Sequence, residues 1–302
     1  NRLWDALGAA HYTQTGTLIL SRPGTTWAQD SAATLDALGK RYRVLGPDEA
    51  ARRFPLLNLD GVARAYWVET GGVLAAERIV DALARHLRAH GVPITEHTAV
   101  TDLDPARGRV WLEDDTQRAA DLLLLAAGPW TARLWPAVAE QLTPSRQLVC
   151  YADMPDDLYA AWRRMPMVLD IADAESRHEG SVYAVPPLGD APLKLGDHAF
   201  SLTGDPDIDR SPGDAELERL FETTCRQLAE PARYRLLSGR TCFYTVAPDS
   251  RFIHAREGRI HVLAGFSGHG FKFGPLIGER FAEVAAGRRA AGDFDRWLAG
   301  TA

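Results

Sequence analysis

The chain has 302 residues, of which 46% are apolar and 25% charged, a balance typical of a globular protein with a substantial core. Its net charge is −6 and its Lys and Arg residues form no block, which argues against nucleic acid as a partner. The longest apolar stretch, at 119–128, contains Asp121 and is too short to cross a membrane, so no membrane partner is expected.

The first residues and the cysteines both bear on where the protein is located. Residues 1–20 hold no apolar core followed by a cleavage site, so no signal peptide is expected. The three cysteines (Cys150, Cys225 and Cys242) are odd in number and widely spaced, which argues against a disulfide framework and favours the cytoplasm. Because the chain starts at Asn1 with apolar residues already at helical spacing, we expect it to be a fragment or to have lost an N-terminal segment.

The first third of the chain predicts short strands and helices. Before residue 60 we expect a strand at 17–20, a turn at 22–24, a strand at 41–45 and a helix at 47–53. Residues 73–90 have the pattern of an amphipathic helix that ends at Gly91. Its expected core face consists of Ile79, Val80, Leu83 and Leu87.

The next segments show two different patterns of polar and apolar residues. Short strands are expected at 98–103 and 109–113, and the apolar run at 121–128 predicts a strand covered on both faces. Further on, mixed polar and apolar residues predict antiparallel strands at 167–170, 181–185 and 193–196. A helix capped by Ser211 is expected at 212–229. Since parallel α/β patterns alternate with antiparallel ones along the chain, we expect a mixed α/β (α+β) protein with interleaved domains.

A glycine-rich segment near the end, GFSGHGFKFGPLIGER at 265–280, follows a predicted strand at 259–264. Apolar residues recur after it at helical spacing, and Gly287 offers a stop. Such strand–loop–helix junctions bind ligands in open α/β sheets, and the helix N-terminus favours negative charge. The pattern fits either an anion site or an ordinary turn. It matches neither the phosphate-loop motif nor a clean GxGxxG, so a nucleoside triphosphate is not expected.

Several reactive side chains are ambiguous from the residues alone. In an extended segment Lys194 and His198 share one face. They could be a functional pair, or they could be solvated residues of an edge strand. Lys272 lies between two phenylalanines, where a buried ammonium needs an anion or loses its proton. Cys242 lies in a strand-like run and reads as a small buried hydrophobe. No cysteine-hydrolase signature and no C-x-x-C occurs and the histidines are dispersed, so no metal is expected.

Longer stretches resemble one family. They are LWDAL, TGTLIL, ETGGVLAAERIVDAL, LLAAGPWTARL, VYAVPPLGDAPLKLGDH, TCFYTVAPDSRFI and GFSGHGFKF, spread along nearly the whole chain. Together they resemble the monomeric sarcosine oxidase and N-methyltryptophan oxidase family. These flavoproteins of the D-amino-acid-oxidase-like superfamily oxidise the secondary amine of N-methyl amino acids. The last four stretches are the most specific.

The resemblance implies roles for individual residues. Cys242 matches the cysteine that bonds covalently to the 8α-methyl group of FAD, which replaces the structural interpretation given above. Lys194 matches the lysine over the flavin ring that assists the reaction with O2, and His198 matches a histidine near the substrate amine. Lys272 matches a lysine that helps to bind the substrate carboxylate. The active-site aromatics correspond to Tyr183 and Tyr244.

The rest of the implied cofactor site consists of Val100, Ala127, Gly128, Gly265, Phe266, Gly268, His269, Gly270 and again Lys272. The family begins with a strand–GxGxxG–helix unit that binds the FAD pyrophosphate, and nothing in this chain supplies it. Asp197 stands where relatives often carry another residue, which leaves the shape of the pocket open. We therefore expect an incomplete FAD-binding Rossmann-like domain interleaved with an antiparallel-sheet substrate domain. The first comprises residues 1–10, 71–140 and 240–302, and the second 11–70 and 141–239.

The function that the resemblance implies is oxidation of an N-methyl amino acid by a cytoplasmic, monomeric FAD enzyme. O2 is the oxidant, and the products are the amine, formaldehyde and H2O2. Two alternatives stay open: a truncated, cofactor-free remnant that acts as a binding or scaffold protein, and an oxidase of cyclic imino acids such as pipecolate.

Overall fold

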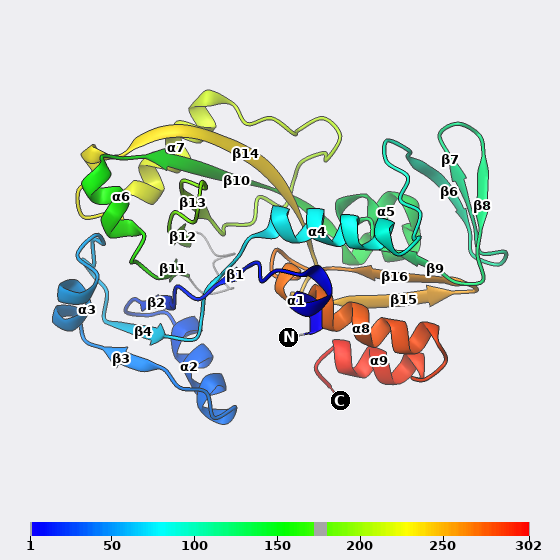
Figure 1. Ribbon diagram of the computed structural model, residues 1–302, viewed down its shortest axis with the longest axis horizontal. Helices are drawn as coiled ribbons and strands as arrows, with labels where there is room; N and C mark the ends of the chain where they lie inside the picture. Colours follow the sequence, from blue (N-terminus) through cyan, green and yellow to red (C-terminus); the bar gives the residue numbers. More distant parts are fainter. Residues whose placement is uncertain (1, 172–179, 302) are drawn as a thin grey trace.

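The computed structural model of the chain describes residues 2–171 and 180–301. It is a mixed α/β protein, as predicted, with a large sheet at one end and two smaller sheets at the other. Helix α4 (Ala76–Ala89) runs between the two ends (Figure 1). Near it lie the short helix α1 (Arg2–Leu7) and a two-stranded ladder of β1 (Tyr12–Thr13) and β5 (Val73–Leu74).

The large sheet has eight strands. In spatial order they are β14 (Arg235–Val246), β10 (Thr143–Asp153), β13 (Leu193–Asp197), β12 (Val182–Val185), β11 (Met167–Asp170), β2 (Thr17–Ser21), β4 (Arg64–Val68) and β3 (Arg43–Leu45). Neighbouring strands are antiparallel except for β11 and β2, which run parallel. The sheet is therefore mixed, whereas a purely antiparallel sheet was expected for this part of the chain.

One face of the large sheet carries the main core. Leu195 and Cys150 are register partners and both are buried on this face. Helices α3 (Pro47–Arg53), α6 (Asp156–Trp162) and α7 (Asp214–Cys225) supply the other side of the core. On the opposite face, α2 (Trp27–Ala37) packs in a cluster with residues of β2, β4 and β11. Among the described residues, the α2 cluster does not extend to the part of this face formed by β12, β13, β10 and β14, which we call the free face.

The other end of the molecule contains two three-stranded sheets. One consists of β15 (Ile253–Glu257), β16 (Ile260–Ala264) and β9 (Leu123–Leu125), and α8 (Gly274–Ala285) and α9 (Ala291–Leu298) pack against it. The other consists of β6 (Val100–Asp104), β7 (Arg109–Leu112) and β8 (Gln117–Ala119). The 3-10 turn η1 (Gly128–Trp130) and helix α5 (Thr131–Leu134) follow β9. Among the described residues no helix is both long and apolar enough to cross a membrane.

Most predicted elements are present with shifted ends. The predicted helix at 47–53 is confirmed as α3, and the strand, glycine loop and helix from residue 260 onward are confirmed as β16 and α8. Several elements were not predicted, among them β4, α2, β10, α6, β15 and α9. The division into two interleaved domains stays a prediction. Its expected boundary at residue 240 falls inside β14, which pairs with β10 along its whole length.

Three predictions about burial and helix ends were wrong. The strand at 121–128 is shorter and is not covered on both faces: Leu123 and Leu125 pack against a buried cluster, whereas Leu124, which points to the other face, is 43% exposed. The helix at 212–229 begins at Asp214, since the carboxylate of Glu216 accepts the Gly213 N–H at 2.8 Å and caps the helix there instead of at Ser211. In the helix predicted at 73–90, Val73 and Leu74 form β5. On α4, Val80 and Leu87 of the predicted core face are exposed.

An ion pair anchors the loop that precedes α7. Arg146 on β10 pairs with both oxygens of Glu216, at 2.8 and 3.0 Å, and also donates to the carbonyl oxygens of Asp209 and Ser211. The hydrogen bonds from Arg146, together with the Gly213 N–H, lower the pKa of Glu216 from 4.5 to about 2. A carboxylate whose pKa is lower in the folded state stabilises the fold above its unfolded pKa and loses that effect as the pH falls.

We therefore expect Glu216→Gln to lower the melting temperature at pH 7. The difference from wild type should shrink as the pH falls from 4.5 toward 2, because wild type then loses the same charge. Thermal unfolding between pH 3 and pH 7 measures this, with Glu218→Gln on the exposed side of the same helix as the control. A difference that does not change with pH would mean that the pair contributes by packing rather than by charge.

Candidate functional site

The free face of the large sheet gathers polar and aromatic side chains by register. Tyr183 on β12 is paired with Gly196 on β13, which is paired with Val149 on β10, and Val149 is paired with Arg240 on β14. Because side chains alternate along a strand, residues two apart from these share the face. This places Lys194, Tyr151, Gln147, Cys242 and Tyr244 on the same face.

The expected pair of Lys194 and His198 lies on this face. The backbone N–H of His198 donates to the Ser181 carbonyl at 3.1 Å and so continues the pairing of β13 with β12. Lys194 Nζ lies 5.7 Å from the centre of the Tyr183 ring. Burial is the largest cause that lowers the pKa of Lys194, and the Arg240 charge lowers it further. The ammonium is thus half-buried among aromatic rings and a second cation, which favours an anionic partner.

The two predicted tyrosines lie in desolvated positions. The Tyr183 ring covers Gly196 so closely that a Cβ at position 196 would lie 2.6 Å from it. The Tyr244 ring contacts those of His198, at 5.9 Å between centroids, and Phe200, at 6.2 Å. Burial raises the pKa of both tyrosines well above the ordinary value, so both are neutral hydroxyls at physiological pH.

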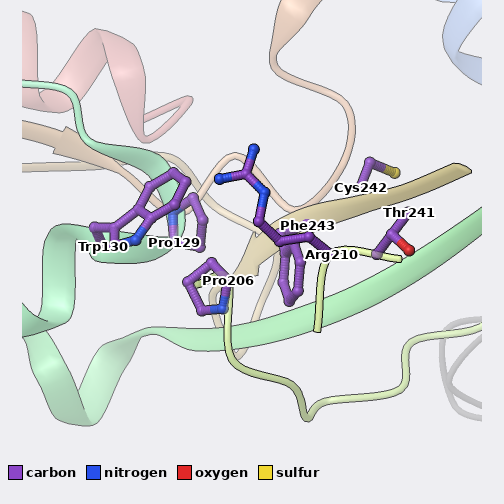
Figure 2. Close-up of a pocket in the computed structure, with 7 residues that line it drawn as sticks. All are labelled: Pro129, Trp130, Pro206, Arg210, Thr241, Cys242 and Phe243. Atoms are coloured by element: carbon purple, nitrogen blue, oxygen red, sulfur yellow. The ribbon is translucent and has the colours of Figure 1, made fainter. Parts of the chain in front are cut away.

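Cys242 differs from the other two cysteines. Cys150 and Cys225 are buried in the main core, whereas Cys242 is partly exposed. It opens onto a cavity of about 250 Å³. Figure 2 shows Pro129 and Trp130 on one side of this cavity and Cys242 on the other, with Arg210 between them. Burial raises the pKa of the Cys242 thiol, while the Lys194 and Arg240 charges lower it.

The glycine loop approaches this face from the other end of the molecule. Ser267 holds the loop against β14: its N–H donates to the Thr245 carbonyl at 3.0 Å and its hydroxyl accepts the Ala247 N–H at 3.1 Å. Gly268 has a φ of +79°, and a Cβ there would lie 2.4 Å from the Tyr244 ring, so glycine is required on both counts. Phe266 and His269 stack on Phe252 beside the loop, with ring centroids 4.9 and 5.1 Å from it.

Lys272 follows the loop, in the single turn before α8. Its Nζ lies 5.7 Å from the Phe273 ring, and desolvation by neighbouring atoms lowers its pKa, as predicted. The predicted burial is only partial, because Lys272 and both flanking phenylalanines remain exposed at the surface, where Phe271 and Phe273 are not covered by other elements.

The remaining predicted cofactor residues lie elsewhere. Ala127 and Gly128 lead into η1, which contacts β14 and contributes Pro129 and Trp130 to the cavity beside Cys242. Val100 lies on β6, in a different sheet from Cys242 (Figure 1). The structure therefore places Lys194, Tyr183, Tyr244 and Cys242 on the free face and brings Gly268 against Tyr244, whereas Val100 lies in another sheet.

Sequence reasoning missed four neighbours of this cluster, namely Tyr151, Gln147, Arg240 and Glu77. Gln147 is 2% exposed, pairs with Cys242 in register and donates to Ser145 Oγ at 2.9 Å, but its Oε1 has no hydrogen-bond partner. Arg240 forms an ion pair with Glu77 on α4. The alternation of polar residues in 143–153 was the available signal for Gln147; the Arg240–Glu77 pair joins residues 163 positions apart and has no local signal.

Three observations fit a large aromatic group that carries both a hydrogen-bond donor and negative charge, such as FAD. A buried amide oxygen beside Cys242 lacks a partner. The ammonium groups of Lys194 and Lys272 have no carboxylate within ion-pair distance in the described part of the chain. The glycine loop has no side chain at Gly268, where its backbone packs against the Tyr244 ring. Cys242, Lys194 and the loop at 265–272 would hold such a group.

Comparison with known proteins agrees with this geometry. The chain is 26% identical over 287 residues to a monomeric sarcosine oxidase from Bacillus sp. (strain NS-129), which covers 91% of this chain and 72% of that protein. It is 25% identical over 288 residues to an N-methyl-L-tryptophan oxidase from Yersinia pestis, which covers 92% of this chain and 75% of that protein. The structure superposes on L-proline dehydrogenase from P. horikoshii with a TM-score of 0.77 at 19% identity, covering 99% and 79% of the two chains. At that identity the likeness concerns the fold.

The fold and the site thus define a flavin-dependent oxidoreductase. Residues 1–284 match the family described as "FAD dependent oxidoreductase", and the chain belongs to this family. The relatives described above, which the chain resembles along about nine tenths of its length, are named sarcosine oxidase and N-methyl-L-tryptophan oxidase, in agreement with the resemblance seen in the sequence stretches.

Proposed function

We propose that the protein oxidises the secondary amine of an N-methyl amino acid. In the overall reaction the N-methyl amino acid, O2 and H2O give the primary amine, formaldehyde and H2O2. The observation that supports this most is the single sheet face that carries Lys194, His198, Tyr183, Tyr244 and Cys242 opposite the loop that ends at Lys272.

The chain's own residues would bind and orient the substrate on this face. Lys272 lies at the rim with a half-desolvated ammonium, which suits the carboxylate of an amino acid. His198 and the Tyr244 ring lie side by side and would line the amine end. The neutral tyrosines and Phe200 exclude water around this end, which strengthens charge interactions in the pocket.

FAD, when bound, accepts two electrons from the substrate and passes them to O2. We propose that Cys242 attaches it covalently, because Cys242 is the partly exposed cysteine and projects from the same sheet face as Lys194 and Tyr244. Lys194, half-buried on the same face, would stabilise the negative charge that O2 acquires. The protein is proposed to act as a monomer.

Flavin binding and a substrate panel test this proposal. We expect the full chain, produced in a host supplied with riboflavin, to be yellow and to release H2O2 with sarcosine or N-methyltryptophan. A colourless protein that gains no visible absorbance on incubation with FAD would support the cofactor-free scaffold instead. A yellow protein that oxidises pipecolate but neither N-methyl amino acid would identify the cyclic imino acid oxidase.

A further inference from the structure

Arg240 and Glu77 form an ion pair at the edge of the site that the proposed chemistry leaves without a role. Arg240 lies two residues before Cys242 on β14, so both side chains project from the same face of the sheet. Its Nη1 bonds to a carboxylate oxygen of Glu77, in the first turn of α4. A residue of the large sheet is thereby tied to the helix that runs between the two ends of the molecule (Figure 1).

Two cations, Arg240 and Lys194, lie on the same face of the sheet as Cys242. Lys194 on β13 and Arg240 on β14 flank β10, and both charges favour the thiolate form of Cys242. Burial and the carboxylate of Asp197 act in the opposite direction. The other titratable or charged groups around Cys242 are Tyr183, Tyr244, Tyr151, Glu77 and, across the cavity, Arg210.

We propose that Arg240, held in place by Glu77, is a positioning residue that acts with Lys194 to stabilise the thiolate of Cys242 and so prepares it for covalent attachment of the flavin. The inference rests on the proposed function, and it adds the residue pair that activates the attachment site. The reactive form of a cysteine is the thiolate, and a neighbouring guanidinium increases its population.

The attachment step balances as follows. The sulfur of Cys242 forms a bond to the 8α carbon of the flavin, and that carbon loses a proton. The thiol also gives up its proton. Forming the C–S bond in this way is a two-electron oxidation, and the two electrons remain on the flavin, which is thereby reduced. O2 removes these two electrons, and both protons leave with it as H2O2.

The role of Glu77 is to fix the guanidinium, not to supply much energy. The Arg240 and Glu77 side chains are 50% and 77% exposed, and pairs this exposed contribute little to stability. Without Glu77 the Arg240 side chain can turn away from the sheet face, because the ion pair holds its guanidinium. Glu77→Gln should therefore have a smaller effect than removal of the Arg240 charge.

The thiol of the flavin-free chain provides a direct readout. The chain is produced in a riboflavin-starved host, and the rate of alkylation of Cys242 by iodoacetamide is followed from pH 6 to pH 10 by mass spectrometry of the peptide. We expect Arg240→Gln to shift the pH profile upward and to slow alkylation below the thiol pKa by about three- to tenfold. Arg240→Lys should restore most of the rate, because it retains the charge.

Arg235→Gln, on the exposed end of the same strand, is the matched control and should leave the profile unchanged. The same variants are then incubated with FAD, and the fraction of covalently bound flavin is followed with time; Arg240→Gln should slow it by a similar factor. An unchanged alkylation profile in Arg240→Gln, in a protein with wild-type thermal stability, overturns the inference alone. A wild-type chain that binds no FAD overturns the proposed function, whatever the alkylation result.

Discussion

Replacement of Lys194 by Met is expected to slow the reaction of the reduced enzyme with O2 by about 10²-fold or more, comparable with the loss of one preorganised electrostatic group. Reduction by substrate should slow much less. The physical reason is the position of the ammonium: it is half-buried beside the Tyr183 ring, where a charge interaction is weakly screened. Methionine keeps the length and apolar bulk of the side chain and removes the charge.

Stopped-flow measurement of the two half-reactions decides this prediction. The chain contains two other lysines, and both serve as comparisons. Lys40→Met, at the exposed end of the turn after α2, should change neither half-reaction. Lys272→Met should raise the substrate concentration needed for half-maximal reduction and leave reoxidation intact. If Lys194→Met abolishes reduction and leaves reoxidation untouched, Lys194 belongs to substrate binding.

The parts of the fold that could be predicted are those in which one short segment contains its own signal. The strand β16, the glycine loop and α8 are such a case, since an apolar strand, a break and a helical repeat follow each other within thirty residues. The strand β10 was missed because its two faces are both largely buried and its site face carries polar residues, Ser145 and Gln147. Apolar periodicity therefore does not stand out against its surroundings.

Helix α2 was missed for a related reason. Its buried positions are Ala28 and Ala32, which give only a weak hydrophobic stripe. Its first turn also lacks a side-chain cap, so neither its start nor its buried face is marked in the sequence.

The site residues likewise fall into those that the sequence could predict and those that it could not. The residues of the LKLGDH and TCFYT stretches were found, because each stretch places its reactive side chains an even number of residues apart, four for Lys194 and His198 and two for Cys242 and Tyr244. Their common environment was not predictable, since it depends on β10, which lies between them and contributes Gln147 and Tyr151. The Arg240–Glu77 pair likewise depends on how α4 lies beside the sheet. The reactive residues of one strand could therefore be predicted from their spacing. The charge interactions between residues of different strands could not, because they depend on the fold.

Replacement of Cys242, the proposed attachment site, is the second change for which we expect a large effect. We expect wild-type holoprotein precipitated with acid to keep its yellow colour, and Cys242→Ala to lose the colour completely to the supernatant. The reason is that only a thiol that reaches the site as a thiolate can form the bond. Cys150 and Cys225 are buried, and burial raises their pKa values to about 11 and about 12, so they remain protonated in the core. Cys225→Ala is the matched control and should stay yellow after precipitation. A Cys242→Ala variant that keeps its colour would move the covalent bond to another residue, and Arg240 would then have no thiolate to stabilise.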